Sequence, residues 1–327
     1  MHNKINNILV FRNDRFGEFI LNIPAFKALK SAYPGSKITL VVDYYVAELA
    51  ATIDCVDDVI IWNNKKHSLI DILRFAASLR RRKFALSVVF NPVKESHWIC
   101  FLAGIPIRLG YNRKCGFLLT HKVERLNSDG QRHEVIFNLD LLKAISINST
   151  DTLVALSPTD YDKEFVDRLL SESGIAPGDN FIVLHPWTSD PVKEWPTEKF
   201  QSLAYYLTNN AGLKVVVIGG QQEKARGDAF CKENSKLINF VGKISLRQLA
   251  ALLHRSALLV SNDSGPVHLS GAVGRPVLAL FRDDISAKGP KRWGPWGENG
   301  SVISKNSLQQ IEVDEVVVRI KQILRLN

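Results

Sequence analysis

LLVSNDSGPVHL, at residues 258–269, begins as a strand and ends as a helix. The apolar residues at its start are typical of a buried strand, and Pro266 marks the first turn of a helix. Gly265 permits a tight backbone in the polar loop that joins them. A strand, a short loop and a helix form the repeating unit of α/β proteins with parallel sheets, so this segment predicts that fold class.

The same alternation of apolar runs and helical periods occurs in both halves of the 327-residue chain. We expect two Rossmann-like, doubly wound domains, one at 1–156 and the other at 157–327. A helix at 313–324 could close the second domain or pack back on the first. The predicted strands are 8–11, 37–42, 58–61, 85–90, 107–110, 181–184, 214–218, 237–240, 258–261 and 277–281. The predicted helices are 19–31, 68–80, 95–103, 197–209, 223–234, 245–254 and 266–273.

The composition, with 46% hydrophobic and 23% charged residues, is that of a folded, soluble protein. The most apolar run, 98–107, is too short to span a membrane; it could touch lipid, but we expect it to form a buried helix. The N-terminus shows no secretion signal, which predicts a cytoplasmic protein. The four cysteines lack the spacing of metal ligands, so no metal site is expected.

The net charge of +9 lies mostly in the first half of the chain. Residues 1–155 hold 21 Lys and Arg against 14 Asp and Glu, a balance of +7, whereas residues 156–327 hold 21 against 19, a balance of +2. Such a bias favours an anionic partner, such as nucleic acid, a membrane surface or a phosphorylated substrate, although it could serve solubility alone. We expect no nucleic acid, because no basic element interleaved with aromatic residues stands out.

Functional residues are expected in the strand-to-helix loops, at a cleft between the two domains, because ligands of open α/β sheets bind at the carboxyl ends of the strands. The helix that begins near Pro266 favours an anion at its N-terminus, and Ser264 can add a hydroxyl, so a phosphate fits there. Asp263 would repel a phosphate and is better suited to capping the helix or to accepting hydrogen bonds from hydroxyls. Helix capping alone is the alternative explanation.

Two further loops of the second half carry polar side chains in corresponding positions. Thr188, Ser189 and Lys193 follow a predicted strand and could hold a diphosphate. Glu223 follows the next strand, where ribose hydroxyls lie in nucleotide-binding domains. A solvated lysine and a first-turn glutamate are also common where no ligand binds.

Glu18 follows Gly17 at the start of the first predicted helix. Its carboxylate could act as a general base toward a substrate hydroxyl, or it could only stabilise the helix dipole. The loop before it lacks G-x-G-x-x-G, which disfavours a nicotinamide-dependent dehydrogenase. The chain also lacks the motifs of P-loop kinases, zinc proteases and serine hydrolases, and it has no D-x-D pair in a cleft loop.

Taken together, these loops resemble those of the ADP-heptose:lipopolysaccharide heptosyltransferases, inverting glycosyltransferases of family 9 with the GT-B fold. The likeness extends over nearly the whole chain, and its last segment is the most specific because length, order and polar residues all fit at once. The matching segments are ILVFRNDRFGEFILNIP at 8–24, the loop with K-x-W-P at 185–196, G-G-x-x-E at 219–223 and VGKISLRQLAALLHRSALLVSNDSGPVHLSGAVGRPVLALF at 241–281.

The resemblance implies that the second domain binds the nucleotide sugar ADP-L-glycero-D-manno-heptose and that the first binds a lipopolysaccharide core acceptor, an anionic glycolipid. A carboxylate would take the proton of an acceptor hydroxyl, whose oxygen then displaces ADP, while Lys193 and the helix start stabilise the leaving group. The ADP-sugar is a substrate, so no cofactor and no metal is implied. The donor residues implied are Thr188, Ser189, Lys193, Glu223, Asp263, Ser264, Gly265 and His268.

One position departs from the family, which usually has Gly-Asp where this chain has Gly17 and Glu18. The extra methylene moves the carboxylate by about 1.5 Å, and a misplacement of that order can cost about 10²-fold in rate. The site could be reshaped to suit Glu18, Asp14 could serve as the base instead, or catalysis could be weakened. We favour the first, in which case the acceptor or the sugar differs from the usual pair.

The long loop 112–133 carries basic side chains that could meet the anionic acceptor. Contact with the cytoplasmic face of the inner membrane is expected to be peripheral at most. One alternative is a sibling glycosyltransferase that uses another nucleotide sugar for the outer core or another surface glycan. Another is a binding protein that kept the donor site and lost the base. The acceptor-side candidates are Asp14, Arg113, Lys114, Arg132 and His133.

Overall fold

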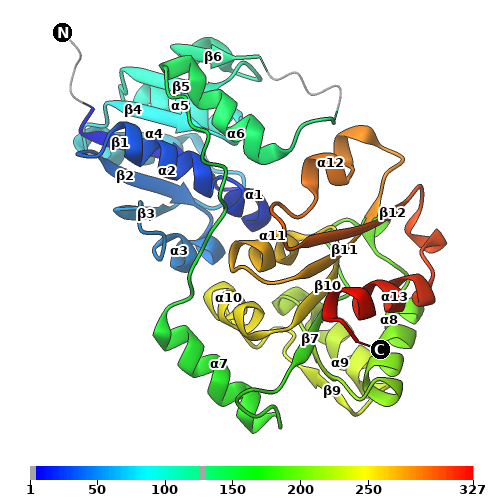
Figure 1. Cartoon of the computed structure of the whole chain (residues 1–327). Coiled ribbons are helices and arrows are strands. Elements are labelled where there is room, and N and C mark those ends of the chain that lie inside the picture. The colour runs from blue at the N-terminus through cyan, green and yellow to red at the C-terminus, as the bar shows by residue number, and fades with distance from the viewer. Residues whose placement is uncertain (1–4, 125–129, 327) are drawn as a thin grey trace. The chain divides into compact units, whose positions relative to one another are not determined.

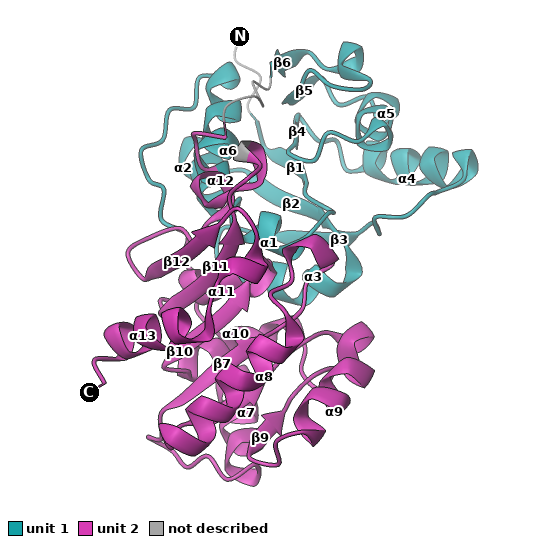
Figure 2. Cartoon of the chain, turned by 90° about the vertical axis from the view of Figure 1, so that its right-hand side faces the viewer, with its two compact units in different colours: residues 1–128, 134–153 teal, residues 129–133, 154–327 magenta. Residues whose placement is uncertain are grey.

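The computed structural model describes residues 5–124 and 130–326, which divide into two compact units (Figure 1, Figure 2). Unit 1 comprises Met1–Ser128 and Glu134–Leu153, and unit 2 comprises Asp129–His133 and Val154–Asn327. Each unit has one parallel sheet with helices packed against it, so the predicted α/β class with two doubly wound sheets is confirmed.

Unit 1 is built on six parallel strands in the order β3-β2-β1-β4-β5-β6. The strands are β1 (Asn7–Phe11), β2 (Lys37–Val42), β3 (Asp58–Ile61), β4 (Leu86–Val89), β5 (Ile107–Tyr111) and β6 (His121–Val123). The helices are α1 (Phe16–Ile20), α2 (Ile23–Ala32), α3 (Tyr44–Ala50), α4 (Leu69–Arg81), α5 (Lys94–Leu102) and α6 (Glu134–Leu142), with short 3-10 helices η1 (Gly116–Leu118) and η2 (Lys143–Ile145).

Unit 2 has the order β12-β11-β10-β7-β8-β9. Its strands are β7 (Phe181–His185), β8 (Lys214–Val217), β9 (Leu237–Asn239), β10 (Leu258–Asn262), β11 (Val277–Arg282) and β12 (Gly300–Lys305). Its helices are α7 (Asp160–Glu172), α8 (Thr197–Tyr205), α9 (Lys224–Lys232), α10 (Leu246–Arg255), α11 (Gly265–Ala272), α12 (Pro290–Trp293) and α13 (Val313–Leu324). Its short 3-10 helices are η3 (Pro191–Lys193), η5 (Gln221–Glu223), η6 (Ser286–Lys288) and η7 (Leu308–Gln310), and η4 (Tyr206–Asn210) is a π-helix.

Both sheets have the same topology when their strands are numbered within each unit, with the third strand at one edge and the first strand beside the fourth. In this doubly wound order the direction of winding reverses between the first and fourth strands. The reversal lies between β1 and β4 in unit 1 and between β7 and β10 in unit 2. Ligands of such sheets bind beyond the carboxyl ends of these strands, which locates the candidate site of each unit.

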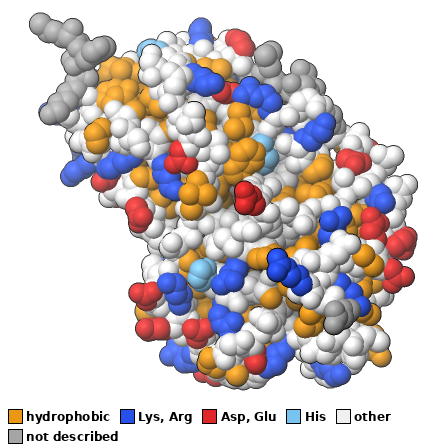
Figure 3. Space-filling model, viewed as in Figure 1, with side chains coloured by type: hydrophobic (Ala, Val, Ile, Leu, Met, Phe, Trp, Pro, Cys, Tyr) orange, Lys and Arg blue, Asp and Glu red, His pale blue; other side chains and the backbone are white. Residues whose placement is uncertain are grey.

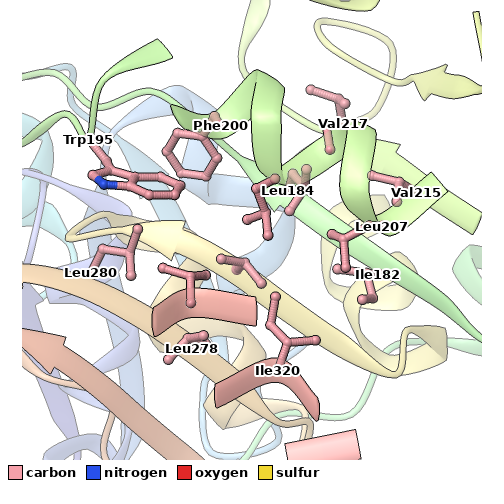
Figure 4. Close-up of a cluster of buried hydrophobic side chains, with 14 of the residues drawn as sticks. Ile182, Leu184, Trp195, Phe200, Leu207, Val215, Val217, Leu278, Leu280 and Ile320 are labelled. Carbon is pink, nitrogen blue, oxygen red and sulfur yellow. The ribbon is translucent and has the colours of Figure 1, made fainter. Parts of the chain in front are cut away.

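The strands of unit 2 are unbroken apolar runs because their side chains form its hydrophobic core. Side chains of β7, β8 and β11 pack against α8 and α13, as Figure 4 shows for residues from Ile182 to Ile320. Trp195 and Phe200 meet edge to face with ring centroids 4.9 Å apart. The indole N–H of Trp195 donates to the carbonyl of Ile311 at 3.0 Å, so the large ring is buried without an unpaired polar group. The buried side of α13 thus belongs to the core of unit 2.

Two predicted helices differ from the structure in instructive ways. The helix expected at 19–31 is broken into α1 and α2, and Pro24 stands in the first turn of α2, where its missing amide is tolerated. The helix expected at 95–103 is present as α5, but it is buried on one face only. Its buried face packs on the sheet, whereas Trp98 and Phe101 are exposed. Among the described residues, no helix is both long and apolar enough to span a membrane.

Gly227 of α9 tests the packing of unit 2. A Cβ at this position would come within 2.6 Å of Val241 Cβ. Gly227→Ala is therefore expected to lower the free energy of unfolding by roughly 1–3 kcal/mol, because overpacking outweighs the helix preference of alanine. Equilibrium urea unfolding measures the change.

The matched control is Gly271→Ala in α11, where the added Cβ meets only the carbonyl oxygen of Trp296, at 3.4 Å. This variant should be as stable as the wild type or slightly more stable. A loss of stability of equal size in both variants would contradict the packing argument.

Candidate functional site

The loops after β7 and β10 are joined by a hydrogen-bonded group of three side chains. His185 Nδ1 lies 3.0 Å from Ser264 Oγ and 3.2 Å from Ser261 Oγ, and the two hydroxyls are 2.8 Å apart. Burial lowers the pKa of His185 to about 4, so the imidazole is neutral at pH 7. The group fixes the start of α11 against the end of β7. His185 and Ser261 were not among the predicted site residues.

Lys193 and Asp263 form an ion pair between the same two loops. Both side chains are largely buried, and the backbone amide of Lys193 donates to the carbonyl of Asp190 at 2.8 Å to close the turn η3. The pairing explains how a carboxylate can stand beside a predicted phosphate site, because Asp263 balances the lysine charge. The ammonium group nevertheless retains donors for a second anionic partner, since it has three N–H bonds.

Ser264 stands at the N-cap of α11, yet its hydroxyl makes no capping hydrogen bond to the helix. The hydroxyl is used by His185 and Ser261 instead. The first-turn amides of α11 therefore receive no acceptor from the N-cap side chain, as an anion-binding helix start requires. Gly265 is the first residue of this helix, and His268, one turn further, is buried.

The loop between β7 and α8 is held rigid by its tryptophans and by Asn262. Trp187 and Trp195 are buried, and the amide of Trp195 donates to Asn262 Oδ1 at 2.9 Å. The side-chain amide of Asn262 in turn donates to the carbonyl of Pro186 at 2.6 Å. Within the loop, the Thr188 hydroxyl donates to the carbonyl of Asp190 at 2.7 Å. The predicted donor residue Ser189 lies beside it and is exposed.

Glu194 links this loop to α9. Arg226 donates to both of its carboxylate oxygens, at 3.0 and 2.7 Å, and the amide of Thr188 donates to Oε1 at 3.1 Å. Burial alone would raise the pKa of Glu194, but these hydrogen bonds lower it below its usual value. Glu223, predicted to meet ribose, ends η5 after β8, on the same side of the sheet as this ion pair.

At the switch point of unit 1, Arg12 is buried between two carboxyl groups. The guanidinium is 2% exposed, and its nitrogens lie 3.3 Å from Asp14 Oδ2 and 3.3 Å from Glu18 Oε2. Glu18 belongs to the first turn of α1, as predicted, and its side chain remains partly accessible. The structure therefore brings both candidate bases to one buried cation.

The pKa of Asp14 lies far above its ordinary value. Burial is the main cause, and the neighbouring charge of Glu18 adds to it, so that the pKa of Asp14 is raised to about 8 although Arg12 opposes the shift. Glu134 of α6 is also buried and contributes a further negative charge near Arg12. Two carboxyl groups that share one buried guanidinium raise each other's pKa, which favours a proton on one of them.

Several buried polar atoms of unit 1 have no hydrogen-bond partner among the described residues. They include Arg12 Nε, both side-chain polar atoms of Asn22 and the side-chain oxygens of Asn13 and Asn138. Buried polar groups are normally satisfied, so Arg12 Nε is suited to a hydroxyl group of a ligand or to water. A charged residue directly after an apolar strand, as Arg12 is, was the available signal for it in the sequence.

The basic acceptor candidates are divided between the two units. Arg113 and Lys114 belong to unit 1, on an exposed turn between β5 and η1. Arg132 and His133 belong to unit 2. His133 Nε2 lies 2.9 Å from the carbonyl oxygen of Gly294, and its ring centroid is 4.4 Å from that of Trp296, so His133 packs within unit 2. The loop 112–133 is thus not a single structural element.

Comparison with known proteins gives consistent matches. The profile of glycosyltransferase family 9 (heptosyltransferase) matches residues 72–319. Lipopolysaccharide heptosyltransferase 3 of Escherichia coli K12 is 25% identical, over 86% of this chain and 83% of its own length.

Two solved structures share the fold over nearly the full length of both chains. A family 9 glycosyltransferase from Veillonella parvula has a TM-score of 0.89 at 22% identity, covering 99% of each chain. The E. coli ADP-heptose lipopolysaccharide heptosyltransferase II has a TM-score of 0.83 at 20% identity, covering 98% of each chain. The family profile covers well over half of the chain, and the chain therefore belongs to glycosyltransferase family 9, the heptosyltransferase family.

Proposed function

We propose that this glycosyltransferase transfers a heptose, with inversion, from ADP-L-glycero-D-manno-heptose to a lipopolysaccharide core acceptor. The observation that carries the proposal is the carboxyl pair of Asp14 and Glu18 on the buried Arg12, a ready general base at the switch point of unit 1. The relatives, which include an ADP-heptose lipopolysaccharide heptosyltransferase, support the choice of donor and acceptor.

Unit 2 is assigned the donor. Lys193 offers a buried ammonium group, and the start of α11 offers amides that receive no acceptor from the Ser264 side chain. A diphosphate needs both features, since it carries charge on several oxygens. Further donor contacts are proposed for Thr188, Ser189, Glu223, Asp263, Gly265 and His268.

Unit 1 is assigned the acceptor and the base. With the proton on Asp14, Glu18 carries the charge that faces Arg12, and its partly exposed carboxylate can accept the proton of an acceptor hydroxyl. The acceptor oxygen then attacks the anomeric carbon as the bond to the ADP oxygen breaks, which inverts the configuration. Lys193 and the α11 amides stabilise the negative charge on departing ADP.

The acceptor is proposed to be an anionic glycolipid, met by Arg113, Lys114 and Arg132, with the protein acting at the cytoplasmic face of the inner membrane. The excess of seven positive charges in residues 1–155 supports this choice. Glu18, in place of the usual aspartate, favours a second candidate: a sibling transferase that uses another nucleotide sugar.

Glu18→Gln tests the base. The amide cannot take a proton, so turnover should fall by roughly 10²–10⁴-fold, whereas ADP affinity should stay the same. The measurements are ADP release in the presence of ADP-heptose and a core acceptor, and calorimetric titration with ADP. Glu18→Asp should retain intermediate activity, because it keeps the carboxylate but moves it. Unchanged turnover in Glu18→Gln would remove Glu18 from the mechanism.

Asp14→Asn tests the proton on the carboxyl pair. The pKa of Asp14 is about 8 in the folded chain, against an ordinary value of 3.8. As the pH rises, Asp14 of the unfolded chain therefore loses its proton before Asp14 of the folded chain does. Wild-type stability should therefore fall relative to the variant by up to roughly 1 kcal/mol per pH unit between about pH 5 and 8, and then level off. Urea unfolding across this range measures the difference.

The control for this experiment is Asp54→Asn, at an exposed position of the same unit. Any pH effect common to carboxylate-to-amide changes on this unit will appear in this variant as well. A difference for Asp14→Asn that does not change with pH would show that Asp14 does not hold the proton, and Asp14 would then compete with Glu18 for the role of base.

Lys193→Ala tests the donor site. The loss of a charge-assisted contact to the diphosphate should weaken ADP binding by roughly 10–100-fold. Calorimetric titration in EDTA, with ADP and then UDP, measures affinity and base preference together. Lys163→Ala, which removes a surface lysine of α7, is the control and should bind ADP as the wild type does. Preference for UDP would instead favour the sibling transferase.

A further inference from the structure

Three aromatic side chains form an exposed cluster on unit 1, called here the Trp98 cluster. Trp98 and Phe101 of α5 are 39% and 46% exposed, and Phe117 of η1 is 70% exposed. The ring of Trp98 meets those of Phe101 and Phe117 edge to face, with centroids 6.1 and 6.4 Å apart. Exposed apolar rings gathered from two elements are unusual on a soluble surface and mark a binding site.

The segment that carries the Trp98 cluster is basic. Residues 94–123 contain five Lys and Arg, and their single acidic residue is Glu95. Glu95 is turned away from the cluster, since its Oε1 lies 2.6 Å from the indole nitrogen of Trp62 and 2.7 Å from His67 Nδ1. No carboxylate of this segment therefore offsets its positive charge at the cluster. The five basic residues are Lys94, Arg108, Arg113, Lys114 and Lys122.

Arg108 fixes a positive charge beside the rings. Its guanidinium carbon lies 5.6 Å from the centroid of Phe101, and its Nε donates to the carbonyl of Leu118 at 2.7 Å. Arg113 and Lys114 lie on the exposed turn just before Phe117. Figure 3 shows the face of the molecule that Figure 1 presents, with basic and hydrophobic side chains on both units.

Helix α4 also exposes apolar side chains. It packs beside α5 on the same core, and Figure 2 shows the two helices next to each other. Its first turns expose Leu69, Ile70 and Leu73, although a surface helix of a soluble protein normally turns such residues inward. Exposed apolar side chains therefore occur on both helices of this layer.

We propose that the Trp98 cluster and its basic surround dock unit 1 onto an anionic lipid bilayer. Aromatic rings favour the boundary between headgroups and acyl chains, and lysine and arginine beside them pair with anionic headgroups. The charge of the segment matches that occupant, and the half-exposed rings match a shallow insertion. The proposal rests on the proposed function in one respect only: a lipid-linked acceptor gives the docking its purpose.

The experiment measures binding of the full chain to phosphatidylcholine vesicles with and without phosphatidylglycerol, by co-sedimentation. The wild type should bind the anionic vesicles, and salt should weaken the binding. Phe117→Ala should lower the partition coefficient by up to about tenfold, because one ring no longer enters the bilayer. Phe101→Ala should act in the same direction. Tyr161→Ala, at a 70% exposed aromatic residue of α7 in unit 2, is the matched control and should bind as the wild type does.

Several results would overturn the proposal. These are an absence of wild-type binding to anionic vesicles, equal binding to neutral vesicles, and equal binding by Phe117→Ala. Self-association, or binding of single-stranded nucleic acid, that is lost in Phe117→Ala without any vesicle binding would assign the cluster to another occupant.

Turnover with a delipidated core oligosaccharide separates this proposal from the proposed function. Phe117→Ala should keep wild-type turnover on that acceptor, because Phe117 is not part of the donor or base site. Vesicle binding without turnover on any core acceptor would refute the heptosyl transfer and leave the docking surface standing.

Discussion

A parallel strand that is buried on both faces has no room for a charge before its carboxyl end. The central strands of both sheets obey this constraint, because β1 is apolar up to Phe11 and is followed at once by Arg12. β7 ends at His185, and β10 ends at Asn262. Since these strands border the point where the winding reverses, the polar groups of each unit are confined to one place.

The two units treat their buried charges in different ways. Unit 2 pairs Lys193 with Asp263, and partly exposed Arg226 with Glu194, and burial keeps His185 neutral. Unit 1 places two carboxyl groups, Asp14 and Glu18, on the one guanidinium of Arg12. An ion pair favours the charged form of both groups, whereas two acids beside one cation raise each other's pKa. The same fold therefore provides one site of fixed charge and one whose charge can change.

The parts of the structure that depend on local sequence could be predicted, because strands and their loops are specified by short runs of residues. The ten strands expected from apolar runs are present, and the break in the first long helix follows from Pro24, a signal that the period of apolar residues concealed. The importance of Arg12 arises from its burial, and its position directly after an apolar strand was the signal for it that the sequence prediction did not use. The exposure of one face of α5 could not be predicted either, because a run of apolar residues does not show which side of the helix packs on the sheet. The division of 112–133 depends on His133 and Gly294, which are far apart in the sequence.

The group formed by His185, Ser261 and Ser264 has a consequence for regulation. None of its members changes protonation across the physiological range, because the pKa of His185 is about 4 and the others are hydroxyls. In an enzyme of the proposed function, the contact that fixes the start of α11 to the end of β7 would then not change with the acidity of its surroundings. A change of pH would leave this part of the donor site in the same arrangement.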